Sequence, residues 1–176
     1  MGWVLAAQSG SPLGLTVAGN TFNNLGGATG VALASIPANL GSVARVDSGV
    51  TYFKRYTTVT DPVVQTYSTD FRSRSTLRAV MDPKGNIILI NPTVGTLGSL
   101  SQRPLIGPGL FNLDLNLVRT LVVREGWKLQ IRADANSVTN TPQWGDPSLN
   151  INSTNFGNIT TAGGNRIITL QARISF

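Results

Sequence analysis

The chain has 176 residues, of which 41% are hydrophobic and only 12% are charged, against a usual charged share of about 25%. The absence of cysteine excludes a disulfide framework and a thiolate nucleophile, and the absence of histidine removes the commonest general base and transition-metal ligand. The net charge of +6 allows an anionic partner, but the 14 basic residues are spread too thinly along the chain to predict a nucleic-acid interface.

The sequence shows no stretch of the roughly 18 to 20 apolar residues that a transmembrane helix needs. Its first residues, MGWVLAAQSGSPLG, also lack the basic start of a secretory signal peptide. On these two points alone we would expect a soluble cytoplasmic protein, and the strand pattern argues against that expectation.

Period-two alternation with strand-like composition occurs in four segments, and helical periodicity is hard to find. A minor hairpin is predicted over 76–91, with the turn at Asp82-Pro83-Lys84-Gly85. The intervening residues 18–109 and 139–164 are rich in Gly, Asn, Thr, Ser and Pro and are predicted to be long loops. The four expected strands lie near 3–17, 110–123, 127–138 and 165–176.

The last three of these segments have one apolar and one polar side. In 165–176 every second residue from Ile168 to Phe176 is apolar, and the residues between them include Gln171 and Arg173. Segments 110–123 and 127–138 alternate in the same way. Two structures fit such strands: a soluble sheet with its apolar side on a core, or a membrane barrel with its apolar side on lipid.

The lengths of the connections favour the barrel. Residues 124–126 form a tight turn, whereas the other two connections are long and would fall at the opposite end of an up-and-down meander. Short turns at one end and long loops at the other are typical of transmembrane barrels. We therefore predict one all-β segment over 1–176: an antiparallel up-and-down meander of about four long strands plus a minor hairpin, part of a transmembrane β-barrel with long outer loops.

The tight turn also predicts which residues of the two strands beside it lie opposite one another. Leu121 should face Leu129, Leu117 should face Ala133 and Leu115 should face Ala135 on the apolar side. On the other side we expect a polar ladder that faces the barrel lumen, made of Asp114, Asn116, Arg132, Asp134 and Asn136. Arg119 breaks the pattern by falling on the apolar side, from which a long side chain can reach the lipid head groups.

The final strand ends on an aromatic residue. Bacterial outer-membrane proteins resemble the chain in this respect, since their last strand ends in Phe or Trp and is read by the barrel-assembly machinery. That resemblance implies an assembly signal formed by Ile168, Leu170, Ala172, Ile174 and Phe176.

Five further motifs resemble TonB-dependent receptors of the type that carries a carboxypeptidase-regulatory-like domain. Residues 2–12 look like the opening of one of their late strands, and RPLIGPGLFNLD at 103–114 is similar to their GPG-x-x-N-x-D strand start. REGWKLQIRAD at 124–134 matches an E-x-x-x-L-x-x-R-x-E strand, with Asp134 in place of Glu. NTPQW at 140–144 resembles N-x-P-x-F, and FGNI at 156–159 resembles F-G-x-I.

This resemblance implies the C-terminal strands of a bacterial outer-membrane receptor whose barrel has about 22 strands. The plug domain, the segment that contacts the energising inner-membrane protein and the signal peptide of such receptors would all lie upstream, so transport by these residues alone is not expected. The implied partners are outer-membrane lipid and lipopolysaccharide, the remainder of the barrel or other copies of the chain, and the barrel-assembly machinery.

The sequence shows no pattern that predicts catalysis. It lacks a phosphate-binding loop and a dinucleotide fingerprint, its eight acidic residues are scattered, and we expect no enzyme, cofactor or metal site. Basic residues gather loosely in the predicted long loop, where they could hold lipopolysaccharide phosphates or another anion. They are Lys54, Arg55, Arg72, Arg74 and Arg78.

Two alternatives to the receptor segment stay open. Because a chain with exposed strand edges can pair edge to edge, the first is an extracellular structural or adhesive β protein that assembles into fibres. The second is a soluble β domain that binds carbohydrate or nucleic acid, which the sequence favours least.

Overall fold

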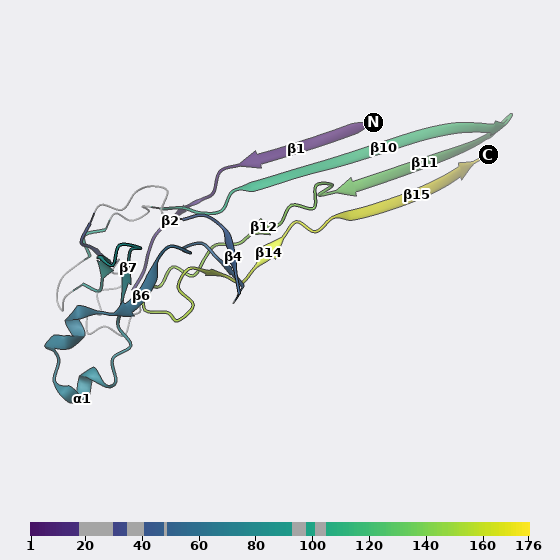
Figure 1. The fold of residues 1–176 in the computed structure, drawn as a ribbon. Helices are drawn as coiled ribbons and strands as arrows, with labels where there is room; N and C mark the ends of the chain where they lie inside the picture. The colour runs from purple at the N-terminus through teal and green to yellow at the C-terminus, as the bar shows by residue number, and fades with distance from the viewer. Residues whose placement is uncertain (18–29, 35–40, 48, 93–97, 101–104) are drawn as a thin grey trace. The chain divides into compact units, whose positions relative to one another are not determined.

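Four long strands form one antiparallel sheet in the computed structural model, which describes residues 1–17, 30–34, 41–47, 49–92, 98–100 and 105–176 (Figure 1). The order of the strands in the sheet is their order along the chain, so the sheet is the up-and-down meander that the sequence predicts. The strands are β1 (Gly2–Gln8), β10 (Leu110–Arg124), β11 (Trp127–Asn136) and β15 (Ile167–Ser175).

The predicted pairing of β10 with β11 is confirmed at residue level. Leu115 lies opposite Ala135, Leu117 opposite Ala133 and Leu121 opposite Leu129. The register shifts between Val122 and Arg124, so the connection is a bulge followed by a turn of Glu125 and Gly126. Gly126 has a φ of 84°, a conformation that glycine adopts without steric cost.

The first strand is shorter than the predicted segment 3–17. It leaves the sheet after Gln8, and Pro12–Leu13 forms a separate two-residue strand, β2, paired with β9 (Leu105–Ile106). At the change of direction the backbone of Gly10 runs so close to Gly107 that a Cβ on Gly10 would lie 1.8 Å from the Gly107 carbonyl oxygen. Only glycine fits such a close approach.

Residues 10–108 and 145–161 form a second compact unit, distinct from the unit that holds the long sheet. The sequence predicts a long loop over 18–109 with a minor hairpin at 76–91, and the described part of this range holds that hairpin together with further short strands. Residues 18–29, 35–40, 48, 93–97 and 101–104 of that loop lie outside the described residues. Besides β2 and β9, this unit holds β3 (Val31–Ala32), β4 (Ala44–Val46), β5 (Gly49–Thr51), β6 (Thr57–Thr60), η1 (Pro62–Thr66), α1 (Thr69–Arg72), β7 (Arg78–Met81), β8 (Ile87–Ile90) and β13 (Asn158–Ile159). The short strands β12 (Gln143–Trp144) and β14 (Ala162–Gly163) pair with each other in the sheet-bearing unit.

The second unit has its own apolar core. Leu15, Leu89, Leu105 and Ile151 are each no more than 1% exposed. These residues come from segments far apart in the sequence, so no local sequence periodicity predicts that they share a core. Aromatic rings extend the core, with Phe53 stacked on Phe156 at a centroid distance of 5.0 Å.

The predicted hairpin over 76–91 is confirmed as β7 and β8. Its turn is held by the Asp82 side chain, whose Oδ1 accepts hydrogen bonds from the backbone N–H groups of Lys84 at 2.9 Å and Asn86 at 2.8 Å. The hydrogen bond from the Asn86 N–H is the main cause that lowers the pKa of Asp82 below its ordinary value.

A buried polar network links four segments of the second unit. Asp61 is 1% exposed, and its Oδ2 accepts from the backbone N–H and the Nδ2 of Asn91, both at 2.7 Å. Asn152 then donates from Nδ2 to Asn91 Oδ1 at 2.6 Å, while its own Oδ1 accepts from the Arg78 N–H at 2.8 Å. Because these buried groups satisfy one another, the network fixes the relative positions of its segments.

Candidate functional site: the two faces of the long sheet

The candidate site is the long sheet itself, whose two faces carry chemically different side chains. Strand registers place Leu117, Ala133 and Leu170 in one row across β10, β11 and β15, and they place Asn116, Asp134 and Thr169 in the next. Since side chains of neighbouring rows point to opposite faces, the sheet has one apolar and one polar face.

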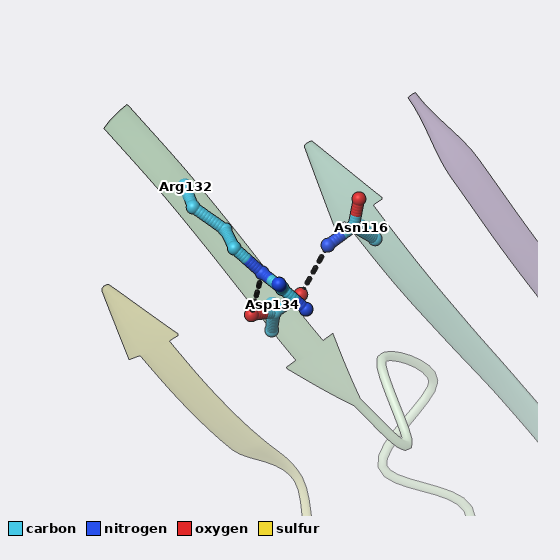
Figure 2. A network of polar contacts seen from close by, with 3 residues as sticks. All are labelled: Asn116, Arg132 and Asp134. Atoms are coloured by element: carbon cyan, nitrogen blue, oxygen red, sulfur yellow. Dashed lines mark hydrogen bonds and ion pairs between the residues drawn. The ribbon is translucent and has the colours of Figure 1, made fainter. Parts of the chain in front are cut away.

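A hydrogen-bonded cluster occupies the centre of the polar face (Figure 2). Asp134 accepts from Arg132 Nε at 2.6 Å through Oδ2 and from Asn116 Nδ2 through Oδ1. The Arg132 side chain is 51% exposed and the Asp134 side chain 23%. An ion pair so exposed to water contributes little stability, and the cluster therefore suits a face that lies against water.

The polar ladder continues toward the end of the sheet from which the long connections leave. Asp114 Oδ1 accepts from Asn112 Nδ2 at 3.0 Å and from the Ser137 N–H at 2.8 Å, and Ser137 Oγ donates to Asn112 Oδ1 at 2.8 Å. The alternation along 110–123 already placed Asn112 on this face. No feature of the sequence predicts that Ser137, which has a φ of 51°, joins this ladder.

A hollow of about 390 Å³ lies over this ladder. Asp114, Asn116, Arg132, Asp134 and Asn136 all line it, so the structure brings the five predicted ladder residues together. Its volume is within the range of small-molecule sites. Its lining also includes Gly2, Trp3, Val4 and Leu115, so charged groups of both signs lie beside apolar side chains.

The apolar face is uncovered. Leu5, Leu117, Ile168, Leu170 and Ile174 are between 51% and 74% exposed. A soluble two-layer protein buries such side chains, and a contiguous exposed patch of them marks a surface that meets another apolar phase. Within the described residues of the sheet-bearing unit, no second sheet covers these side chains.

Aromatic residues lie at the end of this face that is next to the tight turn. The rings of Trp127 and Phe176 are 5.4 Å apart. Arg119 lies opposite Ile131 on the same face, as predicted from the register. An arginine there extends its charge toward the interface while its stem stays in the apolar layer.

The five residues of the predicted assembly signal all lie at the outer edge of the sheet. Ile168, Leu170, Ala172 and Ile174 belong to β15, and Phe176 follows its end and is 91% exposed. Within the described residues β15 pairs only with β11, so its outer edge is open to another strand. Their role in assembly stays a prediction.

The five basic residues of the predicted anion site have different surroundings. Arg72 donates to the carbonyls of Tyr67 at 2.8 Å and Gln65 at 2.5 Å, so its guanidinium is engaged within its own segment. Arg78 is half-buried and contacts Thr58. Lys54, Arg55 and Arg74 are exposed.

The described residues hold no group of three or more acidic side chains that could bind a metal ion. Among them, no helix has the length and hydrophobicity needed to cross a bilayer.

A single-layer antiparallel sheet with an uncovered apolar face and a hydrogen-bonded polar face has the construction of the wall of a transmembrane β-barrel. A family model described as an outer membrane beta barrel domain matches residues 1–169. The chain belongs to that family. No curated protein and no solved structure gave a significant match.

Proposed function

We propose that this chain forms part of the wall and outer loops of a receptor of the TonB-dependent type in a bacterial outer membrane, where the complete barrel takes up a ligand. One observation supports this most strongly: an exposed apolar face and a hydrogen-bonded polar face lie on opposite sides of the sheet across β10, β11 and β15. The first face suits lipid, and the second suits a water-filled lumen.

Four strands do not form a barrel by themselves. About eight strands are the smallest number that closes with a filled interior, and each unpaired backbone group on an edge in lipid costs several kcal/mol. The outer edges of β1 and β15 therefore need further strands, from the rest of a longer chain or from other copies. Uptake is a property of that complete barrel.

The topology also supports an orientation. The turn at Glu125-Gly126 is the only connection between long strands at its end of the described sheet, and the two long connections leave from the other end. Since outer-membrane barrels have short periplasmic turns and long outer loops, the second compact unit belongs to the cell exterior.

The absence of native cysteine gives a clean test of this orientation. Single cysteines are placed by Lys84→Cys in the exposed hairpin turn and by Glu125→Cys in the tight turn, and intact cells are treated with a membrane-impermeant maleimide. We expect Lys84→Cys to react in intact cells and Glu125→Cys to react only after the outer membrane is broken. The unmodified chain is the control for background.

Equal labelling of both cysteines in intact cells, or recovery of the protein in a soluble fraction without detergent, would contradict the proposal. A receptor role further requires that uptake by the whole protein stops when the inner membrane is de-energised.

The open edges of β1 and β15 favour a second candidate, a self-assembling extracellular β protein. Edge-to-edge pairing of copies would satisfy both rows of backbone groups without a membrane. Fibres that form without detergent and bind an amyloid dye would support this candidate over the receptor.

A further inference from the structure

A cleft of about 830 Å³ lies in the second compact unit, apart from the long sheet. It is bounded by β6, by the segment that leads into β7, and by the turn over 152–154. Most of the side chains around it carry a hydroxyl group, including those of Thr58, Thr60, Thr76 and Thr154. Arg78 is the one charged residue among those that line it.

The guanidinium of Arg78 is available to a ligand. Its Nη1 donates to Thr58 Oγ1 at 3.2 Å, which leaves most of its five N–H donors without a protein partner in the described residues. The same bond uses an acceptor position of Thr58 and leaves its O–H free to donate. With no acidic residue in the lining, the cleft presents donors and positive charge.

The cleft is also held in shape before any ligand arrives. The backbone N–H of Arg78 donates to Asn152 Oδ1, and its carbonyl accepts from Asn91 Nδ2 at 2.9 Å. Both asparagines belong to the buried network that ends on Asp61. Arg78 therefore projects from a fixed backbone, and less ordering is needed on binding than for an arginine on an exposed loop.

From this arrangement we propose that the cleft binds a phosphate monoester carried by a sugar. Arg78 pairs with the phosphate through charge-assisted hydrogen bonds, and the surrounding hydroxyls of Thr58, Thr60 and Thr76 bind the sugar hydroxyls. The volume is large enough for a sugar phosphate and lies within the usual range of ligand sites. The proposal rests on the second unit alone and does not depend on the role of the long sheet.

The test measures binding of glucose 1-phosphate to the full-length protein in detergent by titration calorimetry, with free glucose and inorganic phosphate as partial probes. Arg78→Gln is expected to weaken binding about 10- to 100-fold, the usual effect of losing hydrogen bonds to a charged group. Arg45→Gln removes the same charge from an exposed residue of the same unit outside the lining and is expected to leave binding unchanged. Thr76→Val is expected to weaken glucose 1-phosphate binding while leaving inorganic phosphate binding unchanged.

Two sources of the phosphate are then separated. Vesicles that contain a phosphorylated glycolipid are compared with vesicles of phosphatidylcholine, and competition by glucose 1-phosphate shows whether the glycolipid occupies the same cleft. Failure of the wild-type protein to bind glucose 1-phosphate, or an equal loss in Arg78→Gln and Arg45→Gln, overturns the proposal. If Arg78→Gln is misfolded by circular dichroism, the Thr76→Val result decides, since it keeps the scaffold of Arg78 intact.

Discussion

Leu170→Arg and Gln171→Arg test which face of the sheet meets lipid, because these neighbours on β15 point to opposite faces. Leu170 is 74% exposed and lies opposite Ala133. At about 3.3 Å per residue and a tilt near 40°, it lies roughly 15 Å along the membrane normal from Phe176. That depth is about half of an apolar band of roughly 25 Å, so Leu170 is placed near the bilayer midplane.

An arginine at the midplane of a barrel's lipid face costs about 2 to 4 kcal/mol. Leu170→Arg should therefore reduce the folding equilibrium constant about 30- to 900-fold. Gln171→Arg adds the same side chain to the polar face, where it lies opposite Arg132, and this like-charge pair should cost no more than about 1 kcal/mol. The assay is denaturant unfolding of the complete protein folded into phosphatidylcholine vesicles, with the folded fraction followed by its altered mobility on unheated gels.

The reasoning is refuted if Leu170→Arg costs no more than Gln171→Arg, since the apolar face would then not lie against lipid. A larger loss in Gln171→Arg would instead show that the polar face is packed against protein.

Two predictions concern the second compact unit. Asp61→Ala removes the acceptor for Asn91 and the N-cap of η1. We expect this substitution to destabilise the second unit by about 2 to 4 kcal/mol and to speed its cleavage by trypsin. The control Asp47→Ala, at an exposed residue, should leave both stability and cleavage unchanged. Burial raises the pKa of Tyr52, and its neutral hydroxyl donates a hydrogen bond to the Ile106 carbonyl. The contribution of this neutral hydroxyl to the free energy of unfolding is therefore complete below pH 10 and decreases as the pH rises above that value. Tyr52→Phe should remove this alkaline loss from the denaturation profile while costing about 1 kcal/mol at neutral pH, and an unchanged profile would show that Tyr52 does not titrate with unfolding.

The long sheet could be predicted because local rules determine it. Strict alternation fixes which side chains share a face, and a tight turn fixes the register, so a slip of one residue would move Leu117 and Leu121 to the polar face. The order of all four strands followed from the lengths of their connections. The ladder residues Asn116 and Asp134 followed from the same register.

The second unit could not be predicted because no local rule determines its structure. Its strands span only two to four residues, too few to display a period, and its core joins Leu15, Leu105 and Ile151 across most of the chain. The residues that close its cleft come from three separate segments. The sequence indicates Arg78 only as one of several basic residues. No local sequence feature predicts that Asp61 accepts the hydrogen bonds that hold the neighbouring segments.

The contact between Asn91 and Asn152 has a consequence for how such a protein changes over evolution. It links the connection between β1 and β10 to the connection between β11 and β15. The two connections therefore behave as a single module that is attached to the long strands at four points. Shortening either connection alone would strip hydrogen bonds from the other. We expect natural length variation to affect both connections together, so that the module can be exchanged while the long strands stay the same.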